Sequence, residues 1–270
     1  MVVQHNMTSM NANRQLGITV NNQAKATEKL SSGYKVNRAG DDAAGLTISE
    51  KMRSQIRGLN KASTNAEDGI SVIQTAEGAL NEAHEILQRM NELATQAAND
   101  TNTSSDRTAI QKEIDALTSE INRIASTTQF NTMNLLDGDF SGKNLQVGAL
   151  NGQTIQISID AMNASSIGVN GLCVSNNTQA GAAMSKIQGA ISKVSTQRSA
   201  LGALQNRLEH TVKNLDTTAE NTQAAESRIR DTDMADQMVE YSKNNILQQA
   251  GQSMLAQANS ANQGVLSLLQ

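Results

Sequence analysis

The chain has 270 residues and a formal net charge of −4 at pH 7, which is enough length for one large domain or two ordinary ones. The mild acidity argues against nucleic acid as the main partner, because phosphate binding requires clustered Lys and Arg. There is no Pro and no Trp, and only 1% of the residues are aromatic, so the core cannot rely on large aromatic contacts. This composition favours long, uninterrupted helices.

The single cysteine, Cys173, cannot form an internal disulfide, and we interpret it as a small apolar residue in a variable loop. The N-terminal residues lack the basic start and continuous apolar run of a secretion signal. No stretch reaches eighteen apolar residues, the length that a membrane-spanning helix needs. We therefore expect no cleavable signal peptide and no membrane contact.

The chain begins with an amphipathic arm that is predicted to be helical through about residue 35, with Val3 and Met7 among its apolar positions. The segment Ser31–Leu46 follows, and its glycines favour a break in the helix. Asp42 is a candidate cap for the next helix. We expect this segment to connect two helical regions.

Heptad spacing then dominates the sequence. Apolar residues at steps of three and four, from Ile56 to Ala94, predict a helix over about residues 43–99, roughly 80 Å long at ~1.5 Å per residue. The polar stretch Asn99–Asp106 breaks the pattern and offers N-cap residues. A second heptad run, Ile110–Ile124, predicts another helix.

The middle of the chain changes its period from heptads to alternation. Leu145 and Val147, and then Ile155, Ile157 and Ile159, alternate with polar neighbours, and Asn151-Gly152 lies between the two runs. This pattern predicts a β-hairpin near 144–160. Residues 161–177 are small, polar and without pattern, so we expect a loop or irregular surface there.

Helical periodicity returns from Ile187 to Leu215 and again in the last helix. The apolar stripe of that helix comprises Leu247, Ala250, Met254, Ala258, Ala261, Val265 and Leu268. From Asn244 onward there is no charged residue, yet the many Asn and Gln side chains make burial in lipid costly. Because chain ends are usually polar, the apolar tip suggests an end that is buried by other protein, and the simplest partner for one arm is the other.

These elements predict a mainly α fold, a long antiparallel helical rod resembling a coiled-coil bundle, with a small β-hairpin region and paired terminal helices. Residues 1–35 and 234–270 are the terminal helices, and 36–46 and 220–233 are connectors. The rod domain spans 47–219, with the hairpin near 144–160 and a short variable loop at 161–179.

Several segments resemble bacterial flagellin, among them QHNMTSMNANRQLGI, EKLSSGYKVNRAGDDAAGLTISEKMRSQIRGL and, near the C-terminus, NNILQQAGQSMLAQANSANQGVLSLLQ. The resemblance covers roughly 1–160 and 178–270. It implies terminal helices that line the inner tube of a filament, a rod domain around that tube, and a minimal form with core domains only. It also implies export through the flagellar secretion channel.

The chain departs from the family pattern at three positions. Thr132 follows Phe130-Asn131 where the family commonly has Gly, and the chain ends in Gln270 where the family often has Arg. A lone Cys173 is also unusual for the family. We expect Thr132 to alter the turn in which it lies.

One motif carries an implied partner. The segment Leu87–Leu93 resembles the flagellin segment bound by the innate immune receptor Toll-like receptor 5, and the resemblance carries contact positions over to Arg89, Leu93 and Glu113. The expected receptor-binding set is Leu87, Gln88, Arg89, Glu92, Leu93 and Glu113. The same surface is also expected to be buried between subunits, with Leu87 as a heptad core position.

No catalytic, cofactor or metal site is predicted. The three histidines, His5, His84 and His210, lie on separate helical patterns, and His84-Glu85 lacks the second histidine of a zinc-protease helix. The segment that starts at Asp137 resembles the beginning of a calcium loop, but Gly148 replaces the Glu at its twelfth position. An enzyme is therefore not expected.

We interpret the chain as an extracellular subunit that self-assembles into the bacterial flagellar filament. The expected partners are copies of itself, an export chaperone, cap and junction proteins, and Toll-like receptor 5. The assembly core is expected to contain Val3, Met7, Leu247, Met254, Val265, Leu266, Leu268 and Leu269. The alternatives are a hook–filament junction protein, which shares similar terminal helices, and a monomeric secreted helical binding protein.

Overall fold

The computed structural model describes residues 6–267, and the side chains of residues 6–260. Contacts divide the chain into two compact units: the terminal unit runs through Ser54 and resumes at Asn221, and the central unit is Gln55–Glu220. The described elements are α1 (Met7–Ser32), α2 (Ala43–Ala97), α3 (Ser104–Thr127), β1 (Gln129–Phe130), β2 (Met133–Asn134), β3 (Lys143–Gln146), β4 (Thr154–Ile157), α4 (Ala164–Ile167), α5 (Asn177–Arg230) and α6 (Met234–Ser267).

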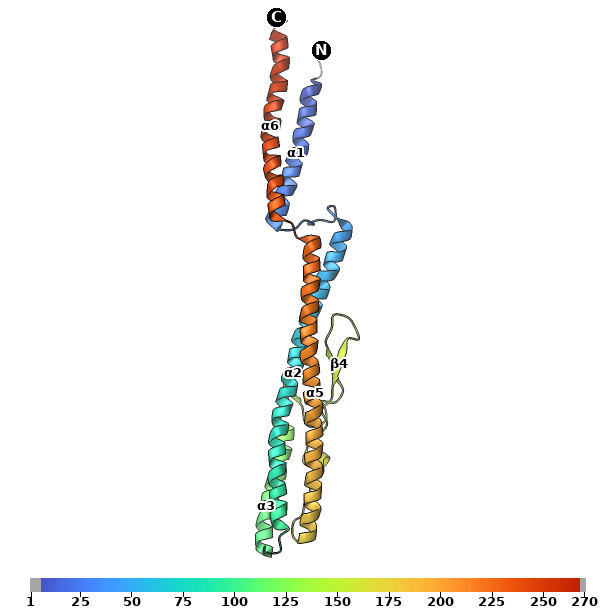
Figure 1. Cartoon of the computed structure of the whole chain (residues 1–270), viewed down its shortest axis with the longest axis vertical. Helices are drawn as coiled ribbons and strands as arrows, with labels where there is room; N and C mark the ends of the chain where they lie inside the picture. The colour runs from blue at the N-terminus through green and yellow to red at the C-terminus, as the bar shows by residue number, and fades with distance from the viewer. Residues whose placement is uncertain (1–5, 268–270) are drawn as a thin grey trace. The chain divides into compact units, whose positions relative to one another are not determined.

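In the terminal unit, α1 and α6 lie side by side and antiparallel (Figure 1). Near one end the Asn6 side chain donates to the Ala258 carbonyl at 2.9 Å, and farther along Leu16 lies against Gly251. The expected pairing of the two terminal arms is confirmed. The helix α1 starts at the Asn6 cap and ends at Gly33, whose left-handed φ of 74° suits glycine.

The two connectors of the terminal unit run together as a short antiparallel bridge between Tyr34 and Asp231. The Arg230 guanidinium stacks over the Tyr34 ring at 4.6 Å and donates to Glu50 Oε1 at 2.8 Å. Asp42 accepts from the Gly45 amide and so caps the start of α2, as expected. Because α5 continues to Arg230, only residues 231–233 separate α5 from α6. The domain boundaries given above, with a connector over 220–233, stay a prediction.

The core of the central unit is a heptad-packed helical bundle. In α2 the residues Ala66, Ile73, Leu80, Leu87 and Ala94 recur every seven positions, and each is fully buried. Another buried series in α5 has the same seven-residue spacing: Ile187, Val194, Leu201, Leu208 and Leu215. Buried isoleucines of α3 complete the cluster. The heptad pattern therefore predicted these helices and their inward faces correctly.

Two small hairpins follow α3. The predicted hairpin is present: β3 pairs antiparallel with β4, with Leu145 opposite Ile155. A second hairpin, β1 with β2, was not predicted, and its two turn residues Asn131 and Thr132 both have positive φ, 47° and 64°. Such a turn favours Asn and Gly and strains a β-branched residue, which is the physical reason why Thr132 is unusual in this position.

The segment after β4 is not the surface loop that its composition suggested. Seven of its apolar side chains are buried: Ile159, Met162, Ala164, Ile167, Val169, Leu172 and Val174. Side-chain amides from the helices hold its backbone through Gln111, Asn122 and Gln197. Gln111 alone donates to the Leu172 carbonyl and accepts from the Val174 amide, both at 2.8 Å. Long-range hydrogen bonds of this kind leave no local sequence pattern.

Candidate functional site

The surface between α1 and α6 is small and polar rather than apolar. We call its least exposed residues, which recur at steps of three and four, the seam. On α1 the seam comprises Ser9, Ala12, Leu16, Thr19, Gln23, Ala26 and Leu30, and on α6 it comprises Gln237, Tyr241, Asn244, Gln248, Gly251, Leu255 and Ala258. Most of these side chains are small or carry an amide or hydroxyl, so the seam buries little large apolar surface.

The large apolar side chains of the same helices are exposed instead: Met7, Met10, Ile18 and Val20 on α1, and Met234, Met238, Val239, Ile246, Leu247 and Met254 on α6. Val239 and Ile246 lie about opposite the seam at ~100° per residue, and their exposures are 69% and 67%. Apolar residues on several faces of a helix are typical of a helix that other protein surrounds.

The expected apolar stripe of the last helix therefore needs a correction. Leu247 is 46% exposed and Met254 is 68% exposed, so the large side chains of the stripe are not buried by α1. Both residues line an open groove of about 680 Å³ between α1 and α6. The seam residues pack against α1 in place of Leu247 and Met254, because they are small enough, at Gly251 above all, to let the two helices approach closely.

The expected assembly core lies partly within these exposed residues. Met7 is 67% exposed and joins Leu247 and Met254 in the set of apolar side chains that the chain itself does not cover. Val3, Leu268 and Leu269 lie outside the described residues, as do the side chains of Val265 and Leu266.

The second candidate site is a polar patch where α2 faces α3 in the central unit. Arg89 of α2 donates through Nε and Nη2 to Glu113 Oε1 of α3, at 3.1 and 2.9 Å, and through Nη1 to Glu92 at 3.2 Å. The hydrogen bond with Glu113, followed by that with Glu92, raises the pKa of Arg89. The resemblance placed Arg89 and Glu113 in one site, and the structure brings them into contact.

The two leucines of the expected receptor-binding set lie beneath this patch. Leu87 is fully buried, as its heptad position predicted, and Leu93 is 2% exposed. Gln88 is exposed and its amide lies 2.9 Å from His84 Nε2. Leu87 and Leu93 therefore support the polar side chains from beneath in this structure, and their contact with a receptor stays a prediction.

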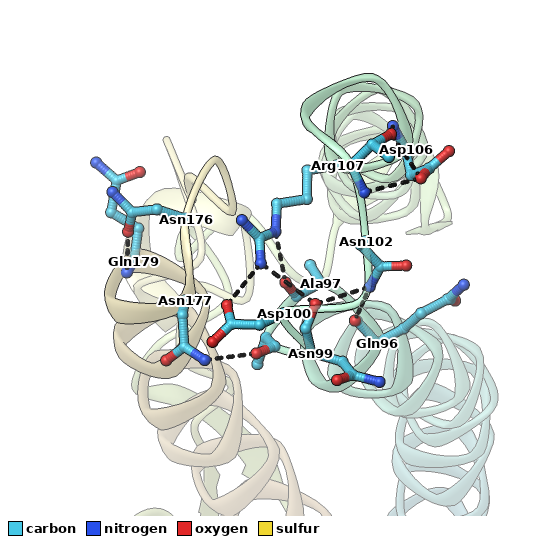
Figure 2. A network of polar contacts seen from close by, with 12 residues as sticks. Gln96, Ala97, Asn99, Asp100, Asn102, Asp106, Arg107, Asn176, Asn177 and Gln179 are labelled. Atoms are coloured by element: carbon cyan, nitrogen blue, oxygen red, sulfur yellow. Dashed lines mark hydrogen bonds and ion pairs between the residues drawn. The ribbon is translucent and has the colours of Figure 1, made fainter.

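A polar network, which sequence patterns did not reveal, closes the end of α2 in the central unit (Figure 2). The last carbonyls of an α-helix lack intrahelical partners. Here Arg107 donates through Nε to the Ala97 carbonyl at 3.0 Å and through Nη2 to the Asn99 carbonyl at 3.2 Å, and Nη2 also pairs with Asp100. Asn177, the first residue of α5, donates to the Ala98 carbonyl. The network thus joins the ends of three helices.

The remaining candidate features are metal-ligating groups, membrane-spanning helices and Cys173. Within the described residues there is no group of three or more His, Cys, Asp or Glu side chains that could hold a metal ion. In the same part of the chain, no helix is long and apolar enough to cross a bilayer. Cys173 is exposed, and its hydrogen bond with Ser175 lowers the pKa of the thiol.

We predict that Arg107→Ala lowers the free energy of unfolding by about 1–3 kcal/mol, because it removes the donor to the Ala97 carbonyl and one of the donors to the Asn99 carbonyl. The Arg107 side chain is only 14% exposed. Arg123→Ala is the matched control, since Arg123 pairs with Glu120 on the surface of α3 at 60% exposure and should change stability by less than about 0.5 kcal/mol. Urea denaturation measures both, and equal effects would contradict the assigned role.

Comparisons with known proteins agree with this architecture. The family model for the bacterial flagellin N-terminal helical region matches residues 3–141, and the model for the C-terminal helical region matches 184–269. A flagellin of Halalkalibacterium halodurans is 55% identical over 271 residues, covering 100% of both chains. Flagellin FlaB1 of Treponema pallidum is 50% identical over 285 residues, again covering 100% of both chains.

Solved structures add the fold. The crystal structure of Bacillus cereus flagellin matches with a TM-score of 0.51 and 31% identity, covering 60% of this chain and 94% of that one. A putative flagellar hook-associated protein from Vibrio parahaemolyticus matches with a TM-score of 0.59, over 71% of this chain and 100% of that one. Its identity is 14%, so this likeness is one of fold alone. With both family models and full-length relatives in agreement, the chain belongs to the flagellin family, whose members are structural proteins and not enzymes.

Proposed function

We propose that the chain is a structural subunit of a bacterial flagellar filament, an extracellular polymer in which copies of the chain pack against one another. Membership of the flagellin family supports this function. The observation that carries it is the arrangement of α1 and α6, which enclose a small, polar seam and leave Met7, Ile246 and Met254 at 67%, 67% and 68% exposure.

Burial of these side chains by neighbouring copies supplies the driving force for assembly. Removal of apolar surface from water is worth ~25 cal/mol per Å², and α6 carries apolar residues both opposite the seam and beside it. No charged residue follows Asn244, so a neighbour can cover this part of α6 without desolvating a charge. The conformational entropy that the terminal helices lose on becoming ordered is then offset by contacts that form only in the polymer.

Two alternatives share parts of this description. A hook–filament junction protein would have similar terminal helices but would not form long filaments alone, and a monomeric binding protein would not polymerise at all. Electron microscopy of the concentrated, purified chain separates them, since long tubes support the filament subunit. Particles of a single size would favour one of the alternatives.

The double substitution Leu247→Asp with Met254→Asp should abolish filament growth. Each aspartate would bring a charge into a packed interior, at a cost of several kcal/mol unless it finds a partner. Both residues are exposed in the single chain, so the thermal melting of the central unit should not change. Seeded polymerisation and circular dichroism melting give the two measurements.

A matched control, Leu247→Ala with Met254→Ala, removes apolar bulk without adding charge. It should slow the growth of filaments without preventing them. Normal filaments from the aspartate variant would mean that this face of α6 is not buried in the polymer.

We further propose that the single chain is recognised by Toll-like receptor 5 through the patch formed by Gln88, Arg89, Glu92 and Glu113. The support is the resemblance of Leu87–Leu93 to the receptor-bound segment of flagellins, together with the ion pair between Arg89 and Glu113. These two side chains are 51% and 45% exposed, so a partner can reach both. On family grounds we also propose that the chain binds an export chaperone and contacts cap and junction proteins. We propose likewise that it is exported without a cleaved signal peptide.

Arg89→Ala combined with Glu113→Ala should weaken binding to the receptor ectodomain by about tenfold or more, as the loss of a central charged contact does. The matched control is Arg123→Ala with Glu120→Ala, which removes another exposed Arg–Glu pair, one that lies within α3. A binding titration of unpolymerised chain compares the variants. Equal affinity of parent and patch variant would remove the patch from the contact surface.

A further inference from the structure

Asn244 is an unusual residue in the seam because its amide is buried without a complete set of hydrogen bonds. Its exposure is 6%, and its Nδ2 has no hydrogen-bond partner among the residues that the structure describes. A buried donor without a partner costs folding free energy, and a leucine, which branches at the same atom, would avoid that cost. The chain nevertheless has an amide here, in the middle of the interface between α1 and α6.

The register of the two helices shows what the amide faces. Ser9 donates to the Asn259 side chain at 2.8 Å, and Leu16 lies against Gly251. If the same register continues along the antiparallel pair, Gln23 lies opposite Asn244. Gln23 is half-buried. Its amide oxygen does not accept from Asn244 Nδ2 in this structure, but rotation of the Gln23 side chain can offer an acceptor there, which an apolar side chain cannot do.

A shift of the helices by one heptad would remove the Gln23 acceptor from the position opposite Asn244. The seam positions of α1 seven residues to either side of Gln23 are Leu16 and Leu30. In either shifted register Asn244 would face a leucine, which can accept no hydrogen bond. Leu16 would also leave Gly251, where it now packs closely, and meet Ala258 or Asn244 itself.

We propose that Asn244 fixes the register of α1 against α6, at a cost in the stability of the pair. A single buried Asn at a heptad position has this effect in coiled coils, because every other alignment buries the amide against apolar side chains. The other seam residues are mostly small or polar, so they discriminate only weakly between registers without Asn244. It concerns pairing within one chain, so it does not depend on the proposed filament.

Disulfide trapping in the soluble, full-length chain tests the proposal. An ideal Cβ at Gly251 lies 3.9 Å from the Leu16 Cβ, within the range of about 3.5–4.5 Å that a disulfide spans. Leu16→Cys with Gly251→Cys therefore reports the observed register, and Leu16→Cys with Ala258→Cys reports a shift of one heptad. Both pairs are made with Cys173→Ser, and brief oxidation traps helices even when they pair only transiently.

The parent should form the first cross-link in preference to the second. Asn244→Leu should raise the ratio of shifted to observed cross-link by about tenfold or more, because the shift would then no longer place an amide opposite a leucine that can accept no hydrogen bond. Asn244→Gln should keep the parental ratio, and so should Gln249→Leu, which changes an exposed amide on the same helix. Equal cross-links in the parent, or an unchanged ratio in Asn244→Leu, would overturn the proposal.

Discussion

The terminal helices of this chain leave most of their large apolar side chains uncovered by each other, and the other features of the terminal unit follow from that constraint. The contact between α1 and α6 is made by residues such as Gln23, Asn244 and Gly251, while Val239 and Ile246 lie about opposite it. A pair of this kind gains little from its own interface. Its apolar surface becomes useful only when further protein covers it.

The central unit shows the contrasting solution. Its helices bury large aliphatic side chains at strict seven-residue intervals, Leu80 in α2 and Leu201 in α5 among them, both fully buried. Arg107 and Asn177 satisfy the last carbonyls of α2, and Gln111 holds the segment after β4. This unit therefore buries its heptad side chains and supplies partners for the carbonyls at the end of α2 from within, so in our account it is the stable part of the chain.

Heptad spacing predicted the long helices well because period and burial coincide in α2 and α5. The same rule failed in α6, where two series with the same interval compete: Leu247 with Met254, and Asn244 with Gly251. Hydrophobicity selects the first series, but close approach of the helices selects the second. Arg107 and Gln111 could not be predicted, since their partners are backbone carbonyls set by tertiary structure. The Arg89–Glu113 contact came only from the resemblance, as the two residues lie on different helices.

Hydrogen exchange of the amides of α1 and α6, measured on the unpolymerised chain and on filaments, tests the central claim most directly. The backbone amides of the buried heptad residues of α2 and α5 in the central unit serve as the internal reference. Our account predicts fast exchange in α1 and α6 of the single chain, because their interface buries little apolar surface, and slow exchange of the same amides in filaments. Protection of α1 and α6 in the verified single chain as strong as that of the reference amides would contradict it.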